Sequence, residues 1–119
     1  MKTRRFETVS CCGSEPPRGG YGEDNPPILD IHGGPVWLWR PRFVGRPGYA
    51  QLLVERGYTL FQPNPRGSSG RGQDHARQVF GDMGGADTQD YLTGIDSLVA
   101  KGVADPKRLG VTGGSYGGF

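Results

Sequence analysis

Three short apolar runs alternate along the chain with two segments of helical period. The runs cover residues 28–31, 58–61 and 108–112, and each leads into a segment rich in glycine or proline. Short apolar runs bounded by such turn residues are typical of buried strands. Because strands alternate with helices, the sequence predicts an α/β protein with a parallel sheet and right-handed crossovers.

The two helical segments differ in length and in the clarity of their period. A short helix is expected over residues 47–56, with its stop at Gly57. A stronger helix begins near Asp87, which is expected to cap it, and ends at Gly102. Residues 73–80 are expected to form a further helix or a turn. The apolar positions predicted to face the core are Tyr49, Leu52 and Leu53 in the short helix and Tyr91, Leu92, Ile95, Leu98 and Val99 in the longer one.

Composition and charge narrow the class of function. The chain has 119 residues, enough for one domain with a modest core, and much of its 22 glycines and 10 prolines clusters in loops. A net charge of +2 is too small to indicate nucleic-acid binding, and the seven arginines from Arg40 to Arg77 lack interleaved aromatic residues. No zinc-ligand spacing, phosphate loop or dinucleotide fingerprint is present. We therefore expect neither a cofactor nor a metal.

The cysteines and the first residues favour a reducing compartment. Cys11 and Cys12 are adjacent, with Cα atoms about 3.8 Å apart, which is shorter than an ordinary disulfide spans. Residues 1–26 show no period and are expected to be an irregular lead-in to a domain over residues 27–119. No apolar run typical of a signal peptide or a membrane helix follows Met1. The expectation is a cytoplasmic protein that does not associate with membranes.

The last seven residues carry the clearest candidate chemistry. Gly113, Ser115 and Gly117 form a G-x-S-x-G motif directly after an apolar run. In a nucleophile elbow, a strand turns sharply into a helix and presents a serine hydroxyl at the turn. Glycines two residues before and after the serine allow backbones to pack closely around such a turn. Ser115 is the candidate nucleophile, and a plain glycine-rich turn with an exposed serine is the alternative.

A second motif, His-Gly-Gly-Pro, spans His32 to Pro35 and follows the first apolar run. In α/β-hydrolases one oxyanion donor is the backbone N–H after the nucleophile, here that of Tyr116. The other donor comes from a His-Gly-Gly-type loop after an earlier strand. Two partial motifs in this order are more specific than either one. The aromatic residues of the following loop, Trp37, Trp39 and Phe43, are expected to pack it onto the body, or else to line a substrate pocket.

Five ordered segments resemble the prolyl oligopeptidase family of serine peptidases, above all its acylaminoacyl-peptidase and dipeptidyl-aminopeptidase-like branch. They lie at residues 32–35, 55–58, 63–68, 81–85 and 105–119, within a match from about Pro27 to Phe119. The resemblance implies a partial α/β-hydrolase fold that stops at the nucleophile elbow, with a mostly parallel sheet and flanking helices. It places the strand at Ile28 between those at Tyr58 and Leu109. It also implies hydrolysis of short peptides by acyl transfer.

The resemblance also implies roles for single residues. Ser115 matches the nucleophile, and Tyr116 matches the residue whose backbone N–H faces the oxyanion. Gly34 matches the second donor, with Gly33 as the near alternative. His32 stands where some relatives place a tyrosine that helps to hold the oxyanion.

Arg66 is expected to brace the site by pairing with a carboxylate. The rest of the catalytic triad is not recognised, because in this fold an aspartate and a histidine follow the serine. His32, His75 and every aspartate precede Ser115, and His75 is expected to be a solvated surface residue. The 119-residue chain alone is therefore expected to be inactive, and its third strand to be an unpaired sheet edge.

Two other functions stay open on the sequence. A carboxylesterase of the same fold shares both motifs, although such enzymes usually carry a fourth small residue at the position of Pro35. A non-catalytic binding fragment is the other alternative, and it requires that the chain alone holds a partner.

Overall fold

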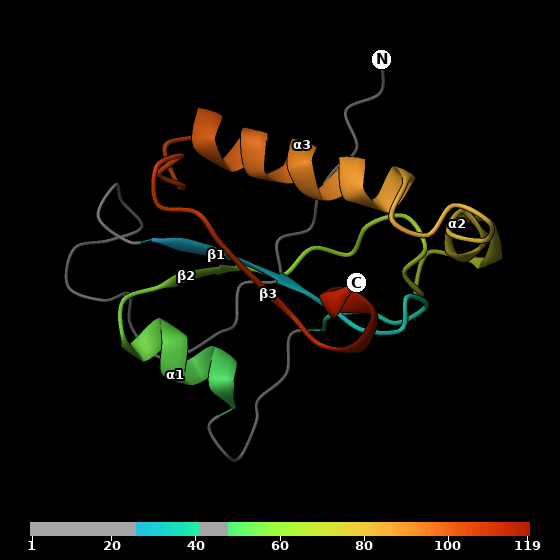
Figure 1. The fold of residues 1–119 in the computed structure, drawn as a ribbon, viewed down its shortest axis with the longest axis horizontal. Coiled ribbons are helices and arrows are strands. Elements are labelled where there is room, and N and C mark those ends of the chain that lie inside the picture. Colours follow the sequence, from blue (N-terminus) through green and yellow to red (C-terminus); the bar gives the residue numbers. More distant parts are fainter. Residues whose placement is uncertain (1–25, 41–47) are drawn as a thin grey trace.

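The computed structural model describes residues 26–40 and 48–119, and Figure 1 shows the elements along the chain. The predicted lead-in lies outside the described residues except for Pro26, as do both cysteines and Phe43. Each predicted strand is present, with its ends within two residues of the expected ones. The elements are β1 (Pro27–Ile31), α1 (Tyr49–Glu55), β2 (Thr59–Phe61), α2 (Gln73–Arg77), α3 (Ala86–Ala100), β3 (Gly110–Gly113) and a 3-10 turn, η1 (Ser115–Gly118).

The three strands form one parallel sheet in the order β2–β1–β3. In the central strand, Ile28 pairs with Leu60 of β2 and with Gly110 of β3. Within the described residues β3 lies at the edge of the sheet, and its Val111 is 70% exposed. The predicted parallel sheet, the central position of the first strand and the edge position of the third are thus confirmed.

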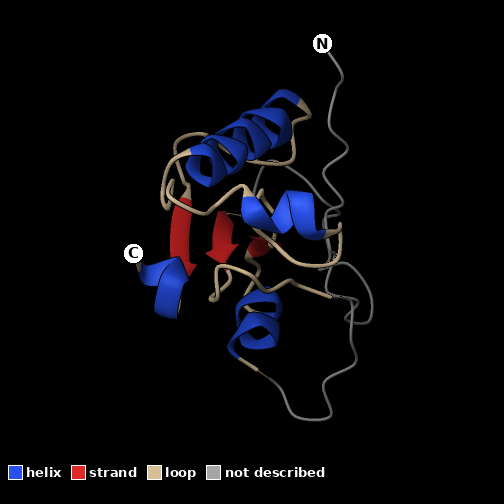
Figure 2. Ribbon diagram, turned by 90° about the vertical axis from the view of Figure 1, so that its right-hand side faces the viewer, coloured by secondary structure: helices blue, strands red, loops and turns tan. Residues whose placement is uncertain are grey.

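Helices α1 and α3 lie on opposite sides of the sheet (Figures 1 and 2). Covering both faces of a parallel sheet buries its central strand, which explains why β1 reads as an apolar run. All three strands point the same way. The segments that follow Ile31, Phe61 and Gly113 therefore lie at one end of the sheet, where parallel sheets build their sites.

Within the described residues the apolar core is small: it contains Phe61, Val79, Tyr91 and Ala104, together with the fully buried Pro27 and Pro63. Gly94 of α3 lies against Phe61, because a Cβ at Gly94 would meet ring atoms Cζ and Cε1 at 2.7 and 2.9 Å. Glycine inside a helix costs about 1 kcal/mol relative to alanine. At Gly94 this cost accompanies the close approach of the helix to the sheet.

The buried face of α3 differs from the predicted one. Its buried residues are Asp87, Asp90, Tyr91 and Gly94, a spacing that follows one side of a helix. Leu92 is 53% exposed, so the prediction that it packs inward was wrong. The other predicted apolar positions of this helix are buried or half-buried. The two aspartates turn inward because their partners come from other segments, which periodicity alone cannot reveal.

The N-terminus of α3 is capped by another residue than the predicted Asp87. The N-cap position is Gly85, and Oδ2 of Asp82 accepts a hydrogen bond from the backbone N–H of Ala86 at 2.9 Å. Asp87 lies in the first turn of the helix and uses its carboxylate elsewhere. The correction matters for the site, because Asp87 is free to bind another segment.

The predicted glycine stops of both helices are confirmed, since Gly57 and Gly102 have φ values of 87° and 71°. On α1 the predicted apolar face is only partly covered, because Tyr49 and Leu52 are exposed and Leu53 is half-buried. Over residues 26–40 and 48–119, no helix combines the length and apolarity needed to cross a lipid bilayer.

Replacing Gly94 with alanine is expected to destabilise the chain by up to about 2 kcal/mol, because overpacking against the Phe61 ring costs about 1–3 kcal/mol and alanine regains about 1 kcal/mol of helix propensity. Gly48→Ala is the matched control, since a Cβ at Gly48 meets no atom within 4 Å. Urea unfolding followed by circular dichroism measures both variants. Equal free energies of unfolding for Gly94→Ala and the unmodified chain would contradict this packing of α3.

Candidate active site

Ser115 is the first residue of η1, directly after the turn that ends β3. Its φ of 56° falls in the left-handed region, which is uncommon for a residue other than glycine and marks a strained position. The residue is exposed. A strand, a sharp turn and a helical turn therefore follow one another here, as the nucleophile elbow requires.

Gly113 and Gly117 allow this turn to close. A Cβ at Gly113 would overlap the carbonyl group of Gly117, and a Cβ at Gly117 would overlap the carbonyl group of Ile31. No side chain fits at either position, so backbone contact accounts for both glycines of the motif. The same contact holds the turn against the end of β1.

The loop after β1 lies beside Ser115. Ile31 pairs with Gly113 in the sheet, so the segments that follow the two strands begin at the same level. A Cβ placed on Gly33 would lie 3.2 Å from Cβ and 3.7 Å from Oγ of Ser115. The tertiary structure thus brings the two motifs of the sequence into contact.

His32 is buried, and both of its ring nitrogens have partners. Nδ1 lies 2.7 Å from the carbonyl oxygen of Gly33, and Nε2 lies 2.9 Å from Oγ of Ser68. A carbonyl oxygen can only accept, so Nδ1 carries the proton. Burial lowers the pKa of His32, against the opposing effects of the Gly33 hydrogen bond and of Asp30. The ring is therefore neutral, and Nε2 accepts a hydrogen bond from the Ser68 hydroxyl.

The hydrogen bond from His32 orients one peptide group. The carbonyl of Gly33 and the N–H of Gly34 belong to the same planar unit, and in a trans peptide they point in opposite directions. Fixing the carbonyl toward His32 therefore fixes the N–H of Gly34 away from it. Gly34 has a φ of 126°, and a Cβ there would lie 2.8 Å from the backbone nitrogen of Val36, so this position requires glycine.

Arg66 pairs with Asp90 of α3. Its Nε and Nη2 donate to separate carboxylate oxygens, each at 2.8 Å, and its backbone N–H donates to Oδ2 at 2.8 Å. Nη2 also donates to the carbonyl of Ala86 at 2.9 Å. The hydrogen bond to Asp90 is the main reason why the pKa of Arg66 is raised. Bidentate arginine–carboxylate pairs are strong, so this pair fixes the loop that also carries Ser68.

The side chain of Tyr116 is anchored to the start of α3. Its hydroxyl donates to Oδ2 of Asp87 at 2.7 Å and accepts from the backbone N–H of Gly84 at 3.0 Å. Its ring stacks on Phe119, with ring centroids 5.9 Å apart and an angle of 12° between the planes. Burial, followed by the hydrogen bond to Asp87, raises the pKa of Tyr116, so the hydroxyl keeps its proton at neutral pH.

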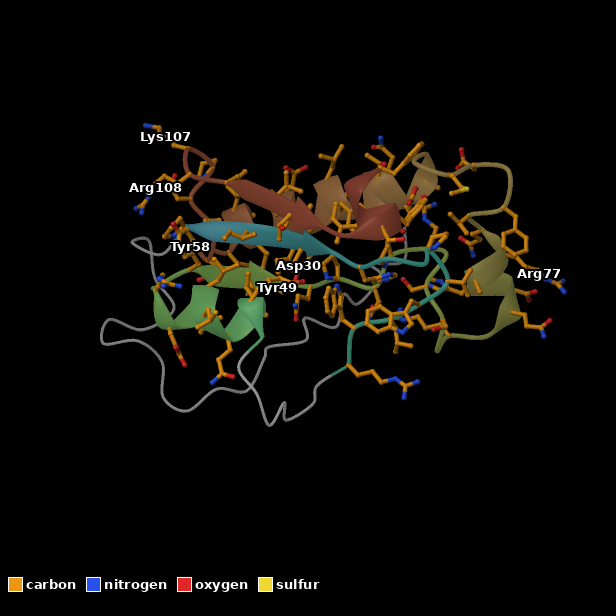
Figure 3. The ribbon with its side chains drawn as sticks, turned by 60° about the horizontal axis from the view of Figure 1, so that its bottom comes forward. Asp30, Tyr49, Tyr58, Arg77, Lys107 and Arg108 are labelled. Carbon is orange, nitrogen blue, oxygen red and sulfur yellow. The ribbon has the colours of Figure 1, made fainter. Side chains whose placement is uncertain are left out.

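Asp30, the fourth residue of β1, is 0% exposed. Its carboxylate accepts from the Tyr49 hydroxyl at 2.9 and 3.0 Å and from the side-chain amide of Gln62 at 2.7 Å. Figure 3 labels Asp30 on β1 and Tyr49, which comes from α1. A buried carboxylate is costly without such partners. These bonds tie α1 and the end of β2 to the central strand.

Trp37 and Trp39 lie beside His32, with ring centroids 6.1 and 6.3 Å from that of the histidine. Trp39 packs the loop onto the body, because its indole N–H donates to the carbonyl of Asp30 and its backbone pairs with the Asn64 side chain. Trp37 is 47% exposed. A cavity of about 370 Å³ is lined by Trp37, Leu38, Trp39, Arg40 and Ser69. Trp39 thus confirms the packing interpretation, while both tryptophans also face a cavity.

Neither histidine is bonded to Ser115 in the described part of the chain. His32 uses both ring nitrogens, and His75 donates from Nε2 to the carbonyl of Pro65 at 3.0 Å. His75 is half-buried, so the prediction of a solvated surface histidine was wrong. Among the same residues, no three His, Cys, Asp or Glu side chains gather in a way that could hold a metal ion.

The predicted site residues do not include Asp30, Ser68, Asp87 or Asp90. Asp87 and Asp90 are one helical turn apart and share a face of α3 with Tyr91. A search for polar residues on the predicted buried face of this helix could therefore have identified them. Ser68 lay in a recognised segment but had no predicted role. Asp30 gave no signal, because it lies within an apolar strand.

The fold and the two adjoining motifs define an α/β-hydrolase domain, of which this chain forms a part. The chain belongs to the prolyl oligopeptidase family, whose sequence profile matches residues 46–119. An uncharacterised peptidase of Bacillus subtilis is 45% identical over 95 residues, which cover 79% of this chain and 14% of the relative. Dipeptidyl-peptidase 5 of Porphyromonas gingivalis is 37% identical over 108 residues, which cover 87% of this chain and 15% of the relative. The chain thus spans only about one seventh of the length of these relatives.

Solved structures show the same similarity. The acylaminoacyl peptidase of Pyrococcus horikoshii matches with a TM-score of 0.72 and 39% identity, over 82% of this chain and 16% of the matched one. An acylaminoacyl peptidase in complex with Z-Gly-Gly-Phe-chloromethyl ketone matches with a TM-score of 0.76 and 35% identity, over 97% of this chain and 19% of the matched one.

The buried neutral His32 is expected to make stability depend on pH. Because its pKa in the folded chain lies below the ordinary 6.5, the unfolded chain binds more protons between these two values. The free energy of unfolding should therefore fall as the pH is lowered from about 7.5 to about 5.5. Thermal unfolding at both pH values measures this loss.

The control for this prediction compares the two histidines. His32→Asn keeps an amide that can donate but does not titrate, so it should reduce the pH dependence. His75→Asn should leave the contribution of His32 in place. If His32→Asn and the unmodified chain lost equal stability over this pH range, the buried neutral state of His32 would be wrong.

Proposed function

We propose that residues 27–119 form the nucleophile-bearing part of a serine peptidase that hydrolyses short peptides by acyl transfer. The observation that carries the proposal is the contact between Gly33 and Ser115, which joins the two motifs at one end of the sheet. Family membership supports the reaction class. The names of similar proteins, a dipeptidyl-peptidase and acylaminoacyl peptidases, support short peptides as substrates.

In this proposal Ser115 Oγ attacks the carbonyl carbon of the scissile bond and forms an ester with the acyl part of the substrate. The carbonyl oxygen becomes negatively charged in the tetrahedral intermediate. The backbone N–H groups of Tyr116 and Gly34 donate hydrogen bonds to it, with Gly33 as the alternative second donor. The amine leaves with a proton, and water then hydrolyses the ester. A preorganised donor of this type contributes about 10²–10³ in turnover.

The hydroxyl of Ser115 needs a general base, because a free serine is a weak nucleophile near neutral pH. His32 is committed to Gly33 and Ser68, which argues against it as that base. His75 is held by Pro65. We therefore propose that the base and its aspartate come from segments outside this sequence, and that the 119-residue chain alone is inactive.

His32 and Arg66 act in this proposal as supports of the second oxyanion donor. Arg66 is held by Asp90 and fixes the loop that carries Ser68, and Ser68 bonds the ring of His32. His32 in turn fixes the peptide group that contains the Gly34 N–H. We also propose a cytoplasmic location, supported by adjacent cysteines that cannot form an ordinary disulfide with each other.

The test uses the full-length protein and a fluorophosphonate probe, which labels activated serines. We expect labelling at Ser115 and hydrolysis of N-acetyl-alanine p-nitroanilide and of a dipeptidyl p-nitroanilide. Ser115→Ala should abolish labelling and lower kcat by about 10⁶. The 119-residue chain should show neither activity, because it lacks the base.

Three outcomes would each overturn part of this proposal. Hydrolysis that survives in Ser115→Ala would exclude Ser115 as nucleophile. Activity on p-nitrophenyl esters but not on the anilides would indicate a carboxylesterase. Labelling of the 119-residue chain at the rate of the full-length protein would show that a base lies within the chain.

His32→Ala in the full-length protein is expected to lower kcat by about 10², because the Gly34 N–H loses its fixed direction. Ser68→Ala removes one partner of the same ring and should have a smaller effect. Ser69→Ala is the matched control, since the backbone N–H of Ser69 makes its bond to the Trp37 carbonyl. An unchanged kcat in His32→Ala would contradict this support role.

A further inference from the structure

The hydroxyl of Tyr116 links the turn at Ser115 to the start of α3. The hydroxyl meets two separate groups, the carboxylate of Asp87 and the N–H of Gly84. Both partners come from the segment that starts α3. Four residues beyond the strained turn at Ser115, the chain reaches Phe119, whose ring stacks on the ring of Tyr116.

The burial of Asp87 is unfavourable in free energy, so its position is not explained by stability alone. Its residue surface is 4% exposed, and its Oδ1 is buried with no hydrogen-bond partner among the described residues. A buried polar atom without a partner costs free energy, and the cost is greater for a carboxylate. Since Asp82 caps the helix, Asp87 is not needed for that purpose. Its remaining bond, to Tyr116, is therefore the contact that calls for an explanation.

We propose that Asp87 is a positioning residue, which acts through the Tyr116 hydroxyl to hold the backbone N–H of Tyr116 in the direction that an oxyanion requires. This inference rests on the proposed function, because it gives a purpose to the bond only if that N–H is an oxyanion donor. Asp87 touches neither the substrate nor the reacting atoms.

The geometry explains how Asp87 can restrain the backbone of Tyr116. A tyrosine side chain has two rotatable bonds between its backbone and a rigid ring, so fixing the hydroxyl and stacking the ring restrict the backbone of the same residue. The neighbouring Ser115 has a positive φ, a conformation that surrounding structure must maintain. Gly117, on the other side of Tyr116, is held against Ile31. The Asp87 bond supplies a restraint from a third direction, α3.

The same buried face of α3 also supports the other donor. Asp90 lies one turn beyond Asp87 on the same buried face and holds Arg66, in the loop whose Ser68 bonds His32. Two carboxylates of one helix thus reach the two sides of the proposed oxyanion site. The rigid helix sets the distance between their anchoring points.

The test compares three substitutions in the full-length protein. Tyr116→Phe keeps the ring and the N–H but removes the hydroxyl. Asp87→Leu keeps the approximate size but removes the acceptor, whereas Asp87→Asn retains an oxygen that can accept. Asp96→Asn is the matched control, an exposed aspartate of the same helix.

We expect Tyr116→Phe and Asp87→Leu each to lower kcat about tenfold with KM unchanged, less than the roughly 10²–10³ lost when a donor is removed. Asp87→Asn should recover most of the loss, and Asp96→Asn should change nothing. Because both residues act through one bond, the double variant should be no slower than either single one. An unchanged kcat in Tyr116→Phe, or multiplied losses in the double variant, would overturn the proposal.

A second measurement does not depend on peptidase activity. In the full-length protein labelled with ¹⁵N-tyrosine, the Tyr116 amide is the signal that disappears in Tyr116→Phe. We expect its order parameter to fall from about 0.85 to below about 0.6 in Asp87→Leu. An equal order parameter in both chains would overturn the restraint itself. If Ser115→Ala stayed active while the Tyr116 amide was rigid and lost its rigidity in Asp87→Leu, the proposed function would be wrong and the restraint would be real.

Discussion

The backbone contact among Ile31, Gly113 and Gly117 is the constraint on which the site depends. It requires two positions without side chains, and it requires β1 and β3 to be neighbours in register. When both conditions hold, the serine turn and the glycine loop after β1 meet at one end of the sheet. Larger residues at either glycine would force the two strand ends apart, because the overlapping atoms belong to the backbone and cannot rotate away.

Polar contacts, rather than a large apolar core, hold the loops around this point. The described part of the chain buries few large apolar side chains but also buries Asp30, His32, Gln62, Ser68, Asp87 and Asp90. Hydrogen bonds are directional, so such a network fixes the orientation of peptide groups more narrowly than apolar packing does. The cost is sensitivity, since the loss of one partner leaves another polar group buried and unpaired.

Prediction from sequence was most successful where a local rule decides the structure. The strands followed from short apolar runs, and Gly57 and Gly102 followed from the need for a positive φ at a helix end. It failed for Asp87 and Leu92. Asp87 does not cap the helix because Asp82 does so, and its carboxylate instead bonds Tyr116, which is distant in sequence. Leu92 is exposed because the face of α3 that turns inward carries Asp87, Asp90 and Gly94.

The sequence by itself determined the class of fold, the family and the residues of both motifs, because glycine positions and strand patterns are local requirements. It also pointed to a carboxylate partner for Arg66 without identifying it. Only the tertiary structure decided that this partner is Asp90, that His32 is neutral and bonded to Gly33, and that Asp87 reaches Tyr116. The pairs Arg66–Asp90 and Asp87–Tyr116 join segments that are distant in sequence. The neutral state of His32 depends on its burial, because the surroundings of a group set its pKa.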